Sequence, residues 1–280
     1  MQRVIAYRAN KILFNFIKSN NLRGTIILPA NICPDVVETL TYSGCNLHFI
    51  DIDINSLCLD LHSAMHLIKE ASALLYVHTY GVEHNFNEQF NLIRQENPAI
   101  TIIDDRCLCL PELQEPNSTA DLVIYSTCAK KQVDLGIGGI GFVADRWKYE
   151  EVLMPENAVL ANATWDLDSK SLLTKMDAVI AHKEKLNAVY RSLLPKKIQL
   201  PEAYQHWRFN ILVPNKEEVI QAIFDAGLFA SGHYAPQAEN CPIASNLYNH
   251  VINLFNDFYY TEEQAIQTCK IINEKLKQEL

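Results

Sequence analysis

Short, uninterrupted apolar runs alternate with segments of helical periodicity through the first half of the chain. The apolar runs occupy residues 25–28, 46–50, 73–77, 100–104, 121–125 and 140–143. Between them, residues 61–68 and 86–93 carry apolar side chains at helical spacing. Strands covered on both faces read as continuous apolar runs, and strands that alternate with helices form mostly parallel sheets. The pattern therefore predicts an α/β fold in which helices flank a mostly parallel central sheet.

The second half of the chain has a different pattern of apolar and polar residues. Residues 170–194 carry one long amphipathic pattern, and residues 207–213 alternate as a half-covered strand does. Thr261 with Gln264 is typical of a helix start, and apolar residues follow it at helical spacing. These elements indicate a second, smaller α/β unit. We predict a large domain at residues 1–160, a long connecting helix region at 161–205, and a small C-terminal domain at 206–280.

The chain carries an excess of acidic residues, with 24 Lys and Arg against 33 Asp and Glu and a formal net charge of −9. Nucleic acids and anionic membranes attract basic surfaces, so neither is expected as the main partner. No apolar run approaches the length of a membrane span, and the N-terminal residues lack a signal-peptide pattern. We therefore expect a cytoplasmic protein.

Eight cysteines are scattered along the chain, mostly within apolar runs. Cys107 and Cys109 are separated by one residue, but no second close pair or histidine pair completes a zinc-binding set. In a chain of this size we expect reduced thiols in the core and no bound metal ion.

Polar residues follow two of the predicted strands where ligands of such sheets bind, beyond the carboxyl ends of the strands. Asp104 and Asp105 end one run, and Lys130 and Lys131 follow the next, just before the glycine-rich Gly136-Ile-Gly-Gly. Taken alone, the carboxylates suit a turn cap and the lysines suit a solvated loop. Together, a carboxylate and a lysine 26 residues later suit pyridoxal 5′-phosphate (PLP), which needs a lysine for its aldehyde and an anion for its pyridinium nitrogen.

At this point the sequence resembles the DegT/DnrJ/StrS family of PLP-dependent sugar aminotransferases, of fold type I in the aspartate aminotransferase superfamily. Residues 26–53 look like the family's stretch from the first cofactor-contacting loop through the following strand. The segment YVHTYG at 76–81 is similar to its VH-x-YG signature, IIDD at 102–105 to its acidic pair, and YSTCAKK with GIGG to its lysine segment. The end of the chain, from AGLFASGHYAPQ onward, resembles the family's small domain and last helix.

The resemblance implies a set of cofactor-binding residues. The family's Schiff-base lysine lies five residues before the first glycine of the glycine-rich segment, which makes it Lys131, and the family's phosphate-binding serine falls on Ser126. Asp105 matches the aspartate that holds the pyridine nitrogen. Cys33 stands where the family often places an aromatic residue over the cofactor ring. Three further cofactor contacts fall on the family's phosphate turn, at Arg8, Ala9 and Asn10.

Three residues are candidates for substrate binding. His233 and Tyr234 match a family position close to the active site, and they either line the pocket or pack away from it. Arg208 can meet a carboxylate or phosphate, and a surface salt bridge is an equal alternative. His78, after the run at 73–77, is interpreted as a buried, hydrogen-bonded side chain.

The sequence departs from the family pattern at several points. Tyr7-Arg8-Ala9-Asn10 stands in place of a Ser-Gly-Thr turn, and Leu108 replaces a glutamine three residues past the key aspartate. We find no counterpart of the Asn- and Arg-containing loop that reaches the cofactor of the partner subunit. The chain is also short for the family.

The resemblance implies an aminotransferase that moves an amino group from an amino-acid donor, glutamate by family precedent, to a nucleotide-linked keto-sugar in amino-sugar or polysaccharide biosynthesis. The family builds its site from two chains, so a homodimer is expected. Two alternatives remain: a PLP enzyme of another type, such as a dehydratase or lyase, and a non-catalytic relative with an interaction or regulatory role. Lys131 counts against the dehydratases, because those of the family replace this lysine.

Overall fold

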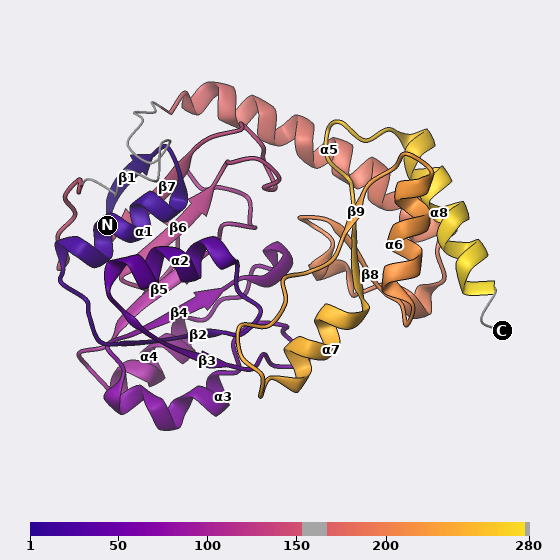
Figure 1. Ribbon diagram of the computed structural model, residues 1–280. Helices are drawn as coiled ribbons and strands as arrows, with labels where there is room; N and C mark the ends of the chain where they lie inside the picture. Colours follow the sequence, from indigo (N-terminus) through magenta and orange to yellow (C-terminus); the bar gives the residue numbers. More distant parts are fainter. Residues whose placement is uncertain (153–166, 278–280) are drawn as a thin grey trace.

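The computed structural model describes residues 1–152 and 167–277 and forms a mixed α/β structure (Figure 1). The first part contains β1 (Gln2–Ala6), α1 (Ala9–Ser19), β2 (Thr25–Pro29), α2 (Pro34–Ser43), β3 (Asn46–Ile50), α3 (Leu61–Ala64), β4 (Ala73–Val77), α4 (Asn87–Glu96), β5 (Thr101–Asp105), β6 (Leu122–Ser126) and β7 (Gly139–Val143). The second part contains α5 (Ser169–Leu193), β8 (Phe209–Leu212), α6 (Lys216–Asp225), β9 (Ala230–Ser231), α7 (Pro242–His250), β10 (Val251–Leu254) and α8 (Glu262–Lys277).

Seven strands form the central sheet, in the order β1-β7-β6-β5-β4-β2-β3. The five strands from β6 to β3 are parallel to their neighbours, and β7 is antiparallel to both β6 and β1. The mostly parallel sheet predicted from the apolar runs is confirmed, with each run forming a strand. Strand β1 was not predicted, because this partly exposed edge strand begins with two polar residues and has only a short apolar run.

Alternate residues of each buried strand point to two different cores, as the pleat of a strand requires. One core contains Leu75, Ile103 and Ile124 and is covered by α1 and α2. The other contains Leu74, Ile102 and Val123 and is covered from below by α4 and neighbouring segments. The continuous apolar runs are thus explained by burial on both faces.

The antiparallel strands β8, β10 and β9 form a second sheet that packs with α5, α6 and α8. Helix α5 runs from beside the large sheet to this smaller unit (Figure 1), as the pattern over 170–194 predicted. The last helix begins as predicted, since Thr261 Oγ1 accepts from the Gln264 amide and Gln264 Oε1 accepts from the Thr261 amide. The predicted boundary between residues 160 and 161 lies outside the described residues, so the division into domains stays a prediction.

Helix α7 belongs to the core of the large sheet although it follows β9 in the chain. Its residues Ala244 and Leu247 pack in that core, and both oxygens of Asp51 accept hydrogen bonds from the first turn of the helix, at Ile243 and Ala244. The segment that leads from β9 to α7 therefore crosses back over the large sheet. This return brings residues of the second half of the chain to the carboxyl ends of the strands.

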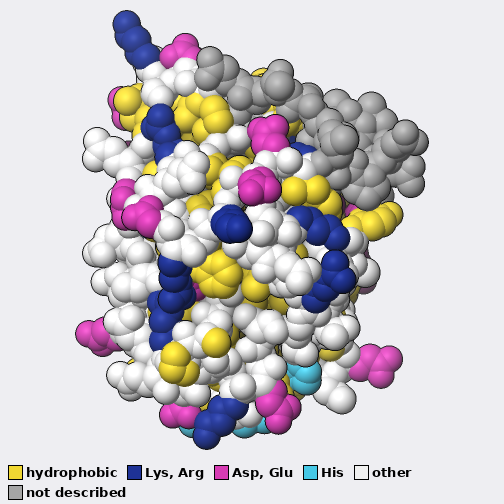
Figure 2. Space-filling model, turned by 90° about the vertical axis from the view of Figure 1, so that its left-hand side faces the viewer, with side chains coloured by type: hydrophobic (Ala, Val, Ile, Leu, Met, Phe, Trp, Pro, Cys, Tyr) yellow, Lys and Arg dark blue, Asp and Glu magenta, His cyan; other side chains and the backbone are white. Residues whose placement is uncertain are grey.

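The surface carries both signs of charge. Figure 2 shows acidic and basic side chains interspersed on one face, with apolar side chains between them. Within the described ranges, none of the helices combines the length and apolar character needed to cross a membrane.

Gly139 tests the close approach between β7 and the start of α1. A Cβ at this position would lie 2.5 Å from the Ala9 nitrogen and 2.6 Å from the Arg8 carbonyl carbon. We expect Gly139→Ala to lower the free energy of unfolding by about 2 kcal/mol, because backbone must shift to accommodate the methyl group. Gly232→Ala is the matched control, since its Cβ would meet only the tip of Lys216 at 3.4 Å, and should change stability by less than about 0.5 kcal/mol. Urea denaturation of both variants decides, and equal effects would contradict the prediction.

Candidate active site

The carboxyl ends of β4, β5 and β6 meet at one edge of the sheet because these strands are parallel. Asp105, the last residue of β5, pairs in register with Val77 of β4 and Ile124 of β6. Ser126 ends β6 two residues further on. The register alone therefore brings the predicted aspartate and serine to neighbouring strand ends, where open α/β sheets bind ligands.

Asp105 is buried at the carboxyl end of β5. It is 4% exposed, and its Oδ1 accepts a hydrogen bond from the Cys107 amide at 2.9 Å. The Cys107 thiol also interacts with this carboxylate. A buried carboxylate at a strand end suits a protonated ring nitrogen.

Asp104 points to the opposite face of β5 and has a full set of partners. His78 Nε2 lies 2.7 Å from Oδ1, while Arg106 and Ser118 donate to Oδ2. The Nδ1 of His78 contacts the Val82 carbonyl at 2.8 Å, so both ring nitrogens face acceptors. Burial acts to raise the pKa of Asp104, but His78 and Arg106 outweigh it and hold the pKa below its usual value. Asp104 and His78 are structural, as the sequence interpretation of His78 proposed.

The loop from residue 127 to 138 carries the two lysines. Asp134 shapes it by accepting hydrogen bonds from the amides of Lys130 at 2.9 Å and Gly136 at 2.7 Å. Lys130 is exposed, whereas Lys131 is half-buried. Gly136 and Gly138 have φ angles of +78° and +113°, which only glycine adopts readily. The glycines of the motif therefore serve the turn itself.

Lys131 and Asp105 act on the same thiol, that of Cys107. Burial raises the pKa of Cys107 well above its usual value, the Asp105 carboxylate acts in the same direction, and the Lys131 ammonium opposes both. The Lys131 ammonium and the Asp105 carboxylate therefore both lie within electrostatic reach of the Cys107 thiol. Their grouping as one site stays a prediction.

A second wall of the site comes from the loop after β2 and from the returning segment before α7. Cys33 ends the β2 loop as the N-cap of α2, and His233 contacts the Asn31 carbonyl through Nε2 at 3.0 Å. Burial raises the pKa of Tyr234, with further contributions from Cys33, from Asp35 and from Asp105. Cys33, His233 and Tyr234 are therefore brought to the same edge as Asp105.

The residues predicted to hold the phosphate meet around Gly138. Arg8 is the N-cap of α1 and pairs with Gly138, and Ser126 Oγ lies 3.5 Å from the Gly138 carbonyl. The free amides at the start of α1 attract anions. The buried Oδ1 of Asn10 has no hydrogen-bond partner among the described residues. Such an arrangement of backbone amides and a hydroxyl fits a phosphate group, and Arg8 is close to it in the chain.

A family model describes this part of the chain. Residues 8–166 match the model of the DegT/DnrJ/EryC1/StrS aminotransferase family, which is more than half of the chain. The chain belongs to this family. It is a PLP-dependent aminotransferase, so the family, the enzyme class and the cofactor predicted from the sequence are confirmed. No curated protein sequence matches the chain significantly.

Solved structures of the family share the fold along nearly the whole chain. An aminotransferase of this family from Brucella abortus is 15% identical, with a TM-score of 0.75 over 98% of this chain and 86% of its own. S. venezuelae DesV is 16% identical, with a TM-score of 0.75 over 98% and 84% of the two chains. DesI, solved in the presence of its TDP-sugar product, is 17% identical, with a TM-score of 0.77 over 98% and 80%.

Arg208 is placed differently from the other predicted residues of this aminotransferase. Its guanidinium is 1% exposed, pairs with Asp257 and lies 3.9 Å from the centre of the Phe255 ring. The alternative of a surface salt bridge is wrong in its location, because the ion pair is buried. Contact between Arg208 and a substrate would require this ion pair to open, and a role of Arg208 in substrate binding stays a prediction.

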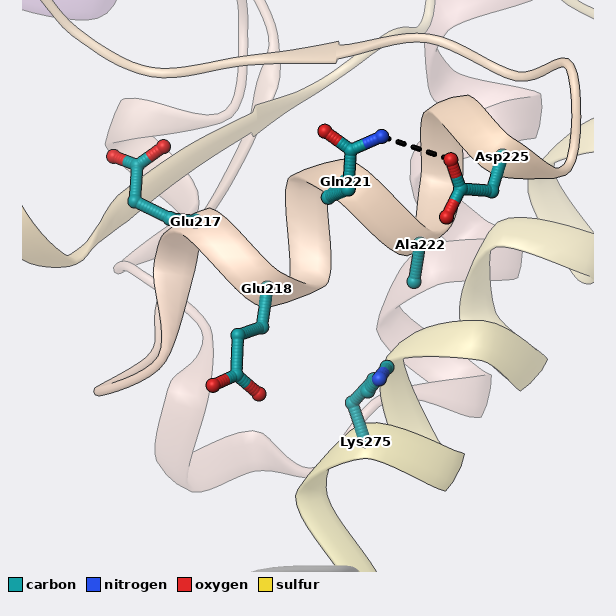
Figure 3. Close-up of a pocket in the computed structure, with 6 residues that line it drawn as sticks. All are labelled: Glu217, Glu218, Gln221, Ala222, Asp225 and Lys275. Atoms are coloured by element: carbon teal, nitrogen blue, oxygen red, sulfur yellow. Dashed lines mark hydrogen bonds between the residues drawn. The ribbon is translucent and has the colours of Figure 1, made fainter.

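Two surface hollows lie away from the predicted residues. One, of about 500 Å³, lies between α6 and α8 and is lined by Glu217, Glu218, Gln221, Ala222, Asp225 and Lys275 (Figure 3). Its polar groups satisfy one another in part, since Gln221 donates to Asp225 at 2.8 Å. The other, of about 280 Å³, is lined by Pro98, Ala99, Arg146 and Trp147. Neither contains any residue predicted to bind cofactor or substrate.

The sequence analysis missed two aromatic residues at the site, Tyr80 and Trp207. Their rings are stacked with centroids 6.2 Å apart, and the Tyr80 ring also meets His233 at 5.0 Å. Tyr80 has a φ angle of +58°, and no pattern in the sequence predicts a left-handed conformation for this tyrosine. Trp207 was read only as one face of a strand, whereas the strand begins two residues later, at Phe209.

His233 gives the aminotransferase a pH-dependent stability. Burial lowers its pKa to about 4, although the hydrogen bond with Asn31 acts in the opposite direction. The unfolded chain therefore binds a proton that the folded chain rejects, and stability should fall as the pH drops from about 6.5 towards 4. We expect His233→Gln, which keeps an N–H donor for Asn31, to lose this part of the pH dependence in urea denaturation. The exposed His48 provides the control, and a His233→Gln profile that matched those of His48→Gln and wild type would refute the prediction.

Proposed function

We propose that this aminotransferase moves an amino group from glutamate to the keto group of a nucleotide-linked sugar. The observation that supports the proposal is that Lys131 and Asp105 both act on the charge of the Cys107 thiol, close to the carboxyl edge of the sheet. Membership of the family supports the reaction class. The likeness in fold to DesI, solved with a TDP-sugar product, supports a nucleotide-linked sugar as the acceptor.

The residues present fit the cofactor, because a buried carboxylate, a lysine and an anion-attracting helix start come from neighbouring elements at one end of the sheet. In our proposal Asp105 holds the proton on the pyridine nitrogen, while Ser126, Arg8 and the backbone at Ala9 and Asn10 hold the phosphate. Cys33 offers its polarizable thiol to one face of the ring. When bound, PLP supplies an aldehyde that takes up amino groups and a ring that accepts electrons.

Lys131 has two roles in this proposal. Its Nζ would hold the cofactor in the resting enzyme, and its free amine would take the proton from the donor's Cα during the reaction. The loop that carries Lys131 is shaped by Asp134, which accepts hydrogen bonds from the amides of Lys130 and Gly136. The retained lysine also disfavours a dehydratase, and the charged residue Arg8 at the phosphate turn disfavours a relative that has lost its cofactor.

His233 and Tyr234 are the proposed substrate contacts. They approach from the returning segment before α7, opposite the lysine loop, and Tyr234 is 38% exposed. A phenol hydroxyl at this place can donate to, or accept from, a sugar hydroxyl or the donor's carboxylate. His233 holds this segment through its hydrogen bond with Asn31. Because its pKa is lowered to about 4, its ring is neutral at physiological pH.

We further propose a homodimer with both sites near the interface, because the open edge of the sheet needs cover that excludes water from the chemistry. The proposed division of the chain remains a large domain at 1–160, a connecting helix region at 161–205 and a small domain at 206–280. The free cysteines among the described residues support a reducing compartment such as the cytoplasm.

Lys131 and Lys130 form a natural test pair, since adjacent lysines differ in exposure and in the charges that surround them. Borohydride reduction of the PLP-loaded protein should leave a pyridoxyl group on Lys131, as located by peptide mass spectrometry. Lys131→Ala should abolish this incorporation and Lys130→Ala should retain it. Pyridoxyl on Lys130, or on neither residue, would refute the assignment.

Asp105→Asn separates the charge of Asp105 from its structural role, because the amide oxygen can still accept from Cys107. With the wild type, glutamate should convert bound PLP to pyridoxamine phosphate, detected by chromatography of the released cofactor in a panel of amino acids. The variant should unfold at an unchanged urea concentration but convert the cofactor at least about 100-fold more slowly, because the ring nitrogen loses its counter-charge. Asp104→Ala is no control, since it leaves His78 and Arg106 buried without their partner. Equal rates in wild type and Asp105→Asn would show that Asp105 does not serve the ring.

A further inference from the structure

Two residues beside the site hold a backbone conformation that L-amino acids disfavour. Tyr80 and Lys130 have φ angles of +58° and +66°, in the left-handed region. Neither is a glycine or an asparagine, so surrounding contacts must hold each in place. Lys130 directly precedes Lys131, and Tyr80 lies in the turn that follows β4 and His78.

Trp207 contacts both of these residues. Its indole Nε1 donates a hydrogen bond to the Lys130 carbonyl at 2.7 Å. Its ring stacks on the Tyr80 ring with an angle of 9° between the planes, and Tyr80 is fully buried. One side chain, at the start of the smaller unit, therefore braces two strained turns of the large unit.

The contact with Lys130 fixes the orientation of Lys131. The carbonyl of Lys130 and the amide of Lys131 belong to the same rigid peptide plane. Trp207 binds the oxygen of this plane, and the Lys131 amide donates to the Cys128 carbonyl at 3.2 Å. The Lys130 amide, on the preceding plane, is held by Asp134 at 2.9 Å. The direction in which the Lys131 side chain leaves the backbone is set by these three hydrogen bonds.

We propose that Trp207 is a positioning residue for Lys131: its indole holds Lys130 in the left-handed conformation, which aims the lysine at the cofactor site. The functional part rests on the proposed role of Lys131. Because Trp207 precedes β8, a movement of the smaller unit relative to the large sheet would alter the placement of the lysine. The relative position of the two units therefore affects where the Lys131 amine lies.

The test compares Trp207→Phe, which keeps an aromatic ring against Tyr80 but removes the donor, with Trp147→Phe, whose tryptophan packs on Phe16 away from the site. Hydrogen exchange of the amides between Cys128 and Gly136 is measured by mass spectrometry in the cofactor-free protein. Loss of one hydrogen bond should speed this exchange about 5- to 10-fold in Trp207→Phe, and Trp147→Phe should match wild type. Unchanged exchange in Trp207→Phe would overturn the proposal.

Lys130→Gly identifies the cause, because glycine adopts the left-handed conformation without help. In the Trp207→Phe background it should restore slow exchange and restore the rate at which borohydride fixes PLP on Lys131. A purely structural loss of packing would not be rescued in this way, and failure of rescue would overturn the proposal. Lys130→Gly alone should raise the urea midpoint, because it relieves the left-handed strain in an otherwise unchanged chain. This measurement still tests the proposal if Trp207→Phe folds poorly. A lowered midpoint would overturn the proposal. If wild type fails to fix PLP on Lys131, the proposed function fails, while the exchange data still decide whether Trp207 holds the loop.

Discussion

The buried carboxylate of Asp104 is the contact on which the geometry of the site depends. It is held between His78 on the β4 side and Arg106 and Ser118 on the following loop. Removing one partner of such a group leaves an uncompensated buried charge, so loss of any of these partners is expected to destabilise the fold. Because successive side chains of a strand point in opposite directions, fixing Asp104 on one face presents Asp105 to the other. Asp104 thus stabilises the structure, while Asp105 faces the candidate cofactor site.

The site exists only because the second half of the chain returns to the first. The segment before α7 is tied to the β2 loop by the amide of Gln237 on Ala30 and by His233 on Asn31, and α7 itself is capped by Asp51. Trp207 makes a separate connection to the lysine loop. Cofactor sites at strand ends need a cover, and here much of that cover is supplied from residues more than 200 positions from the N-terminus.

What the sequence could predict was set by periodicity and local motif order. The buried strands, the long α5, the Thr261–Gln264 cap and the placement of Asp105 and Lys131 at strand ends follow from patterns that span a few residues. The buried ion pair of Arg208 could not be predicted, because its partner Asp257 lies in a loop far along the chain and no local pattern indicates such a pair. The positions of Tyr80 and Trp207 could not be predicted for a similar reason, since they depend on a left-handed backbone at Tyr80 and on contacts between the two units.

The altered phosphate turn is compatible with cofactor binding on electrostatic grounds. A hydroxyl donates one neutral hydrogen bond to a phosphate, whereas a guanidinium donates several and carries a charge, and charge-assisted hydrogen bonds are about twice as strong. Arg8 stands at the N-terminus of α1, where the free amides already favour an anion, and it pairs with Gly138 next to Ser126. The cost of exchanging the hydroxyls for Arg8 is conformational entropy, because a long side chain must be ordered at the ligand. The backbone amides at the start of α1 are positioned by the close approach of Gly139 to Ala9, since a larger residue at position 139 would push the start of α1 away.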